Sequence, residues 1–203
     1  YVAMSDGLFL YEPKQHQLQR ILAEDIRAAT GTNQDITLTP DYMTKRGAEL
    51  RSDYRFLGRT YGGEARLEYL PHDNVLNETR YGLSVQGQDQ ITPNLFGQID
   101  VNKVSDSQYF VDLASNVTQT SVGELQRLGL LRYSGTLFGQ GYSLQTQVQN
   151  FQTLQDPLSP IVPPYNRVPQ IDFATGRNDI AGRFDLSVPA QYVRFTHPTL
   201  VEG

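Results

Sequence analysis

Cysteine and tryptophan are absent from this 203-residue chain, and no stretch approaches the roughly 18–20 consecutive apolar residues of a membrane-spanning helix. The lack of cysteine excludes disulfides, thiolate chemistry and cysteine metal sites. The lack of a long apolar run excludes a helical membrane protein, but not a β-barrel, whose alternating strands look hydrophilic on average. Lys and Arg total only 17 without forming a basic block, and the net charge is −5, so nothing favours a nucleic-acid partner.

Polar uncharged and aromatic residues take the place of aliphatic and charged ones. The hydrophobic fraction is 38% and the charged fraction 19%, below the roughly one half and one quarter of a soluble globular domain. The chain nevertheless has 12 Tyr and 9 Phe, which suits a sheet with one aromatic, apolar face and one polar face. Residues 1–4 lack the basic region and apolar core of a signal peptide. For an outer-membrane protein we therefore expect the natural N-terminus to lie upstream.

From about residue 34 onward, apolar and polar residues alternate with a period of two, which is typical of half-buried β-strands. In residues 48–56, for example, Leu50, Tyr54 and Phe56 fall on one face. Charged residues of alternating sign fall on the opposite face of this run and the next one, and they are Glu49, Arg51, Asp53, Arg55, Glu64, Arg66 and Glu68. Later runs of the same kind cover residues 80–86, 95–102, 144–149, 171–173 and 183–195.

Several of these runs span about 10 residues or more, whereas soluble strands average roughly 5–6 and tilted membrane strands need roughly 9–11. Length and alternation together favour an all-β fold of antiparallel transmembrane strands, that is, a partial β-barrel. The charged face would line a water-filled lumen, and the other face, where a lysine or arginine costs roughly 2–4 kcal/mol, would meet lipid. The pattern also leaves open a large soluble antiparallel sheet with a solvated polar face.

Turn-forming residues separate the runs. Gly62-Gly63 and the segment 176–179 both predict hairpin turns. Two longer stretches, residues 105–122 and 155–169, do not alternate, and the second contains five prolines. Because proline cannot donate to a ladder, this second stretch predicts a loop or an edge strand. Outer-membrane barrels place their long loops on the external side.

Separate motifs across about residues 33–203 resemble, in the same order, the lipopolysaccharide-assembly family LptD. The stretch 35–47, which reads DITLTPDYMTKRG, resembles the segment that opens the barrel in that family. The likeness continues in register at residues 54–57, 67–73, 104–113, 148–154, 167–171 and 192–198. Several motifs in the right order are far more specific than alternation, so the resemblance strengthens the prediction of a barrel.

The resemblance implies that the protein carries lipopolysaccharide from a periplasmic bridge into the outer leaflet of the bacterial outer membrane. It implies no covalent chemistry, so we expect no enzyme and no cofactor. The implied partners are lipopolysaccharide, an LptE-type plug lipoprotein, the periplasmic lipopolysaccharide-bridge proteins and membrane lipid, with no nucleic acid. The charged residues named above become candidates for the lumen face.

The same resemblance implies a lateral opening between the first and last barrel strands, weakened by prolines. Pro40 matches one of those positions and is our lateral-gate candidate, because proline removes a ladder donor. An ordinary turn before Asp41 is the alternative. The family's periplasmic jellyroll and the second half of its barrel have no counterpart in the sequence, and lipid does not tolerate open sheet edges. We therefore expect no transport by this chain alone.

Residues 1–32 differ from the rest of the chain in residue pattern. They instead resemble an internal segment of bacterial FMN-dependent nitroreductases. The matching residues are Tyr1–Met4, 7–14, His16, Leu18 and 22–31. They predict a small hairpin and a helix over residues 23–29, with Gly31 at the position of a C-terminal cap. The basic residues that hold flavin phosphate in those enzymes lie outside such a piece. The chain therefore resembles a chimera joined near residues 31–33.

The remaining candidates for chemistry are isolated residues. His16, His72 and His197 lack metal-ligand spacing, and residues 135–139 lack the serine of a nucleophile elbow. We predict no catalytic, cofactor-binding or metal-binding residue. Two other functions stay open beside the transport barrel: a fragment of a soluble FMN-dependent nitroreductase-type oxidoreductase, and a soluble β-rich binding module.

Overall fold

The computed structural model describes residues 33–113, 123–137, 139–154, 162–180 and 182–198, together with the backbone of three short strands before them. Those three strands form a small antiparallel sheet in the order β1 (Val2–Met4), β2 (Gly7–Glu12) and β3 (Gln17–Ile21). The expected hairpin corresponds to the pairing of β2 with β3. The helix expected over residues 23–29 lies outside the described residues.

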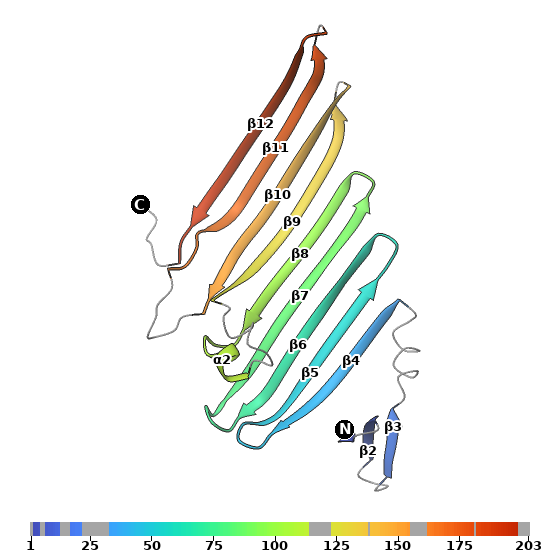
Figure 1. The fold of residues 1–203 in the computed structure, drawn as a ribbon, viewed down its shortest axis with the longest axis vertical. Helices are drawn as coiled ribbons and strands as arrows, with labels where there is room; N and C mark the ends of the chain where they lie inside the picture. The colour runs from blue at the N-terminus through green and yellow to red at the C-terminus, as the bar shows by residue number, and fades with distance from the viewer. Residues whose placement is uncertain are drawn as a thin grey trace.

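The main body is one antiparallel sheet in which every strand pairs with its neighbours in sequence, from β4 at one edge to β12 at the other (Figure 1). Each strand has 10 to 15 residues, long enough for the roughly 9–11 that a membrane crossing needs. The strands are β4 Gln34–Met43, β5 Gly47–Leu57, β6 Tyr61–Asp73, β7 Glu78–Thr92, β8 Leu95–Val104, β9 Glu124–Leu137, β10 Gln140–Thr153, β11 Asn166–Ile180 and β12 Phe184–Thr196. The prediction of an all-β antiparallel fold is confirmed. The barrel is not closed, since β4 and β12 each pair on one side only among the described strands.

The two ends of the sheet differ. Short turns at residues 58–60, 93–94 and 182–183 join strands at one end, which we call the turn end. The turns at residues 44–46 and 74–77 and the longer connections after β8 and β10 lie at the other, which we call the loop end (Figure 1). No helix among the described residues is long and apolar enough to cross a membrane.

Two glycine motifs were wrongly predicted to form turns. Gly62-Gly63 lies within β6, paired with Leu57 and Phe56, and the actual turn occupies residues 58–60. A Cβ at Gly63 would lie 2.3 Å from the carbonyl oxygen of Gln86 and 2.7 Å from the Phe56 ring. Glycine is thus required here for close approach of a ring and a neighbouring strand, one of the reasons for glycine inside strands.

The segment 176–179 is also strand rather than turn, because β11 continues to Ile180. A Cβ on Gly176 would lie 2.8 Å from the carbonyl oxygen of Leu186, so this glycine again permits close backbone approach. Pro169 likewise belongs to β11, which lies between β10 and β12, and not to a loop or edge. It falls where the register shifts between Arg167 and Gln170, the kind of irregular position where an interior strand tolerates proline.

Sequence alternation failed to predict β9, because apolar residues occur on both of its faces. Leu128 and Leu130 pair in register with Gln149 and Gln147, whereas Leu131 pairs with Thr146 and lies on the other face. A strand with apolar residues on both faces lacks the period-two signal on which the prediction depends.

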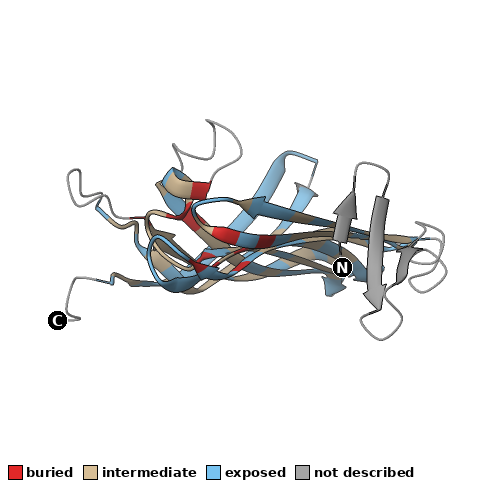
Figure 2. Ribbon diagram, turned by 90° about the horizontal axis from the view of Figure 1, so that it is seen from below, coloured by how far each residue is buried: buried red, intermediate tan, exposed pale blue. Residues whose placement is uncertain are grey.

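The apolar face of the sheet is uncovered. Five aliphatic side chains of this face are between 43% and 51% exposed: Leu50, Leu67, Ile99, Leu131 and Val148. Soluble monomers rarely leave contiguous apolar surface of this extent in water. In Figure 2 most of the sheet is drawn as intermediate or exposed, so the described residues provide no second layer to bury this face.

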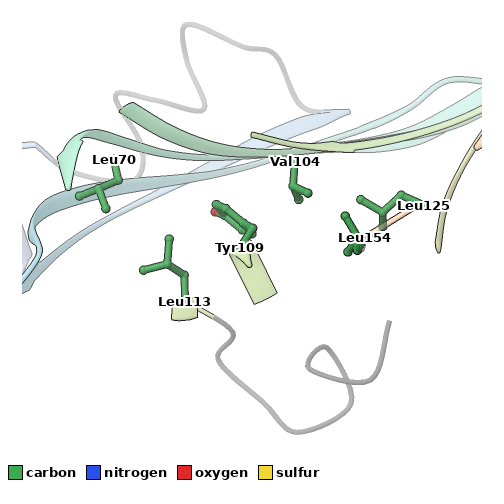
Figure 3. Packing of buried hydrophobic residues seen from close by; sticks show 6 residues of the cluster. All are labelled: Leu70, Val104, Tyr109, Leu113, Leu125 and Leu154. Carbon is green, nitrogen blue, oxygen red and sulfur yellow. The ribbon is translucent and has the colours of Figure 1, made fainter. Parts of the chain in front are cut away.

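A small core does exist at the loop end, beneath the short helix α2 (Tyr109–Leu113) that follows β8. Tyr109 is 1% exposed and packs with Leu113 against the sheet. Figure 3 shows the six side chains of this core, namely Leu70, Val104, Tyr109, Leu113, Leu125 and Leu154. The only hydrophobic core cluster among the described residues thus serves to hold α2 on the sheet.

Candidate functional site

The strand register brings the seven predicted lumen residues onto one face of β5 and β6, here called the polar face. Arg51 pairs with Glu68 and Asp53 with Arg66 directly across the two strands. Directly opposed side chains of a sheet are close enough for opposite charges to attract. The alternating signs along each strand therefore match one another across the pair.

Ion pairs connect these side chains. Arg66 binds Asp53 at 3.0 Å and Glu64 at 3.6 Å, and Arg51 binds the buried carboxylate of Glu49 at 2.9 Å. Arg51 of β5 also binds Asp41 of β4 at 3.3 Å. Arg55 of β5 pairs with Asp35, which likewise lies in β4. Because most of these groups are exposed to solvent, each pair contributes little to stability. Their main effect is to present a continuous charged surface.

The polar face continues on other strands mainly as amide and hydroxyl groups, although β9 contributes Leu128 and Leu130 to it. The Ser84 hydroxyl donates to Asn102 at 2.8 Å, and the Gln147 amide donates to Gln170 at 3.0 Å. Near the turn end it is hollowed into an open groove of about 470 Å³. The side chains that contribute to it include Arg55, Glu64, Gln86, Gln88, Gln98 and Asp100. Such a surface offers many hydrogen bonds at modest charge, which suits hydroxyl-rich ligands.

At the loop end a buried ionic cluster, here called the Arg80 cluster, fixes the connection after β8. Arg80 is 1% exposed and donates hydrogen bonds to both carboxylate oxygens of Asp106 at 2.9 Å, to Asp112 at 2.8 Å and to Asp73 at 3.3 Å. Arg46 completes the cluster by binding Asp73 at 2.6 Å and Asp112 at 3.0 Å. Buried charges are tolerated only when paired and hydrogen-bonded in this way. The cluster joins the turns after β4 and β6 to α2.

Burial alone would raise the pKa of Asp106, but hydrogen bonds from Arg80 and Ser105 and attraction to Arg80 outweigh burial and hold that pKa below its usual value. The carboxylate therefore stays ionised at neutral pH. Tyr109, in the same segment, donates its hydroxyl to Glu68 at 2.7 Å. Burial, and then the proximity of Glu68, raise the pKa of Tyr109. The tyrosine is thus a neutral donor that ties α2 to the polar face.

Sequence patterns did not reveal the Arg80 cluster. Its partners lie 7 to 32 residues from Arg80 along the chain, so no local spacing signals it. The signal that was available is the family motif over residues 104–113, which contains both Asp106 and Asp112. Alternation marked Arg80 as polar, but it could not distinguish a buried cation from a solvated one.

Pro40 lies inside β4, in register with Leu50 of β5, so an ordinary turn is excluded. β4 is the edge strand of the sheet, and its other side has no partner among the described strands.

The described residues include no group of three or more His, Asp or Glu side chains arranged to hold a metal ion. His197 lies against the carbonyl oxygen of Pro163, at 2.9 Å.

Comparison with known proteins gives a consistent result. The family model described as "LptD: LPS transport system D" matches residues 78–201. The LPS-assembly protein LptD of Azoarcus sp. is 41% identical over 167 residues, 82% of this chain and 20% of that protein. Those of Nitrosomonas eutropha and Cupriavidus necator are 35% and 37% identical over 84% of this chain. The chain spans about a fifth to a quarter of the length of these curated relatives.

Proposed function

Because this chain belongs to the LptD family, we propose that it forms part of a bacterial outer-membrane β-barrel that transports lipopolysaccharide into the outer leaflet. The observation that carries this proposal is a sheet of nine long strands with one uncovered apolar face and one ion-paired polar face. An apolar face of this kind is stable against lipid, and a polar face of this kind is stable against a water-filled lumen. The remaining barrel strands would close the open sheet.

The polar face is the proposed path for the hydrophilic part of the substrate. Amide and hydroxyl side chains there can exchange hydrogen bonds with sugar hydroxyls, and arginines such as Arg51 and Arg66 can bind phosphates through charge-assisted bonds. Balanced pairing of these arginines with Asp53 and Glu68 keeps any one contact weak, so that a substrate can move on. An LptE-type lipoprotein in the lumen and periplasmic bridge proteins are the proposed partners.

Reversing charge on the polar face tests the path. Arg51→Glu together with Arg66→Glu, in a full-length LptD-type protein that carries these strands, is expected to lower lipopolysaccharide at the cell surface severalfold. The reason is that each reversal replaces an attraction by repulsion among neighbouring carboxylates. The matched control is Arg59→Glu, since Arg59 lies exposed in the turn at residues 58–60. If the double reversal left surface lipopolysaccharide unchanged, the lumen assignment would be lost.

Pro40 is proposed to weaken a lateral seam at the free side of β4. Proline is tolerated in an edge strand when the backbone nitrogen, which lacks a hydrogen, faces away from the paired strand. In β4 this nitrogen would therefore face the free edge and not β5. Pro40→Ala would add one donor to the seam, worth about 0.5–1.5 kcal/mol, and is expected to slow transport about two- to tenfold. Pro189→Ala is the control, because Pro189 lies in β12 at the opposite edge. Equal effects of the two substitutions would contradict a special role for Pro40.

The separate origin of residues 1–32 is also a proposal. If that segment retained any nitroreductase character, the purified chain would carry flavin and absorb visible light. We expect no flavin absorbance, and β-structure by circular dichroism only when detergent is present. A yellow, water-soluble chain would instead favour the oxidoreductase fragment, and a colourless, water-soluble one a β-rich binding module.

A further inference from the structure

The apolar face carries a groove that the proposed transport path does not use, here called the outer groove. It has a volume of about 660 Å³ and is open along one side, within the roughly 300–1,000 Å³ of typical ligand pockets. Apolar side chains of six strands, β5 to β10, contribute to its lining, among them Phe56, Tyr61, Ile91, Ile99, Leu131 and Val148. The groove lies on the side of the sheet opposite the charged residues of β5 and β6.

Glycines on three neighbouring strands hollow the sheet at this place. Gly87 of β7 and Gly129 of β9 are both in register with Ile99 of β8, and Gly97 pairs with Leu131. An added Cβ at Gly129 would meet nothing within 4 Å, and one at Gly97 would meet only the tips of Ile91 and Leu131. The missing side chains therefore leave a depression bordered by aliphatic and aromatic groups.

One carboxylate interrupts this apolar surface. Asp89 of β7 lines the groove, and its alternation with Gly87 places it on the apolar face. Its Oδ1 atom is buried and accepts no hydrogen bond. No lysine or arginine lines the groove. A buried acceptor without a donor is unfavourable, so the site is incomplete until a donor, preferably a cation, comes from outside.

The position of Asp89 indicates which donor fits. It pairs in register with Tyr61, the first residue of β6, beside the turn at residues 58–60. The rings of Tyr61 and Phe56 lie 6.2 Å apart. Aromatic side chains concentrate at the membrane–water interface of barrels, where lipid headgroups lie. The acyl chains of the same lipids would then run along the glycine-lined depression.

We propose that the outer groove binds an amine-bearing phospholipid, with an acyl chain over Gly97 and Gly129 and the headgroup ammonium on Asp89. Such a lipid supplies in one molecule both things the groove lacks, an apolar filling and a cationic donor. The proposal rests on the apolar face meeting lipid, as in the proposed function, but it does not require that the chain transport anything.

The test is native mass spectrometry of the complete chain in non-ionic detergent, titrated with phosphatidylethanolamine or phosphatidylglycerol of identical acyl chains. We expect preferential binding of phosphatidylethanolamine. Asp89→Asn should weaken the binding of phosphatidylethanolamine about tenfold, because a charge-assisted hydrogen bond is lost. It should leave the binding of phosphatidylglycerol unchanged. Gly129→Leu should displace both lipids by filling the depression.

Two matched variants control for folding. Glu78→Gln removes a carboxylate from the exposed loop end of the same strand, and Gly141→Leu adds a side chain where a Cβ likewise meets nothing within 4 Å. Both should bind lipid as the parent chain does.

Equal binding of the two lipids by the parent chain, or unchanged binding by Gly129→Leu, would overturn the proposal. A dimer that Gly129→Leu dissociates would instead identify a second copy of the chain as the occupant. If the parent chain bound lipid as expected but the Arg51 and Arg66 variants left transport unchanged, the proposed transport path would be rejected and the lipid site would stand.

Discussion

Arg80→Met is expected to destabilise the folded chain by about 3–5 kcal/mol, because it leaves buried carboxylates without their cation. Asp73 is fully buried and Asp106 receives two hydrogen bonds from the lost guanidinium. Arg46 would remain to neutralise Asp73 and Asp112, so Asp106 should suffer most. A loss of this size is a large part of the roughly 5–15 kcal/mol that stabilises a typical protein.

Denaturant unfolding in detergent, followed by circular dichroism, measures this loss. Arg55→Met is the matched control, since it breaks a pair whose side chains are 65% and 43% exposed and should change stability far less than Arg80→Met does. Limited proteolysis gives a second readout, because release of the connection after β8 should open cleavage sites in it before the sheet unfolds. Equal stability of the Arg80 and Arg55 variants would show that the cluster does not hold the fold.

Tyr109→Ala is expected to cost about 3–5 kcal/mol, the usual range for removing a large buried aromatic side chain. Tyr109 is the residue through which α2 fills the small core, and it touches Gly82 so closely that a Cβ there would lie 3.0 Å from its hydroxyl. Its loss would also leave the Glu68 carboxylate without its donor. The helix should therefore detach from the polar face.

Tyr109→Phe separates packing from hydrogen bonding. It keeps the ring and its edge-on contact with Phe110, whose ring centroid lies 5.5 Å away, and removes only the hydroxyl. We expect a loss of about 1–3 kcal/mol for an unsatisfied partner, well below that of Tyr109→Ala. Hydrogen exchange of the backbone amides in residues 105–113 should rise in the alanine variant and change little in the phenylalanine variant. The same exchange in both variants would mean that α2 is held by the Arg80 cluster alone.

The Arg80 cluster and Tyr109 together explain why a short helix is stable on this sheet. A helix of five residues is too short to be stable by itself in water. Here the connection after β8 is held by ionic contacts at Asp106 and Asp112 and by an aromatic anchor between them. Both kinds of contact reach strands far away in sequence, so the stability of α2 depends on the sheet.

The sequence by itself determined the fold class, the polar face and the family. Alternation with a period of two is a local property, so residues 48–56 and 64–69 indicated their strands and the face of each side chain. The seven charged residues came together because antiparallel pairing of neighbouring strands follows almost directly from such a pattern. The family resemblance then indicated an outer-membrane barrel as the setting for two faces of this kind.

Tertiary structure alone decided the features that depend on neighbours distant in sequence. Gly62-Gly63 and Gly176 resembled turns, yet they lie in strands because an adjacent strand approaches too closely for a Cβ. Arg80 resembled any polar strand residue, yet it is buried because three segments fold over it. No sequence pattern singled out Asp89, yet it lines an apolar groove. In each case the deciding quantity is the distance to atoms on another strand, which pairing and packing set and no local pattern of residues contains.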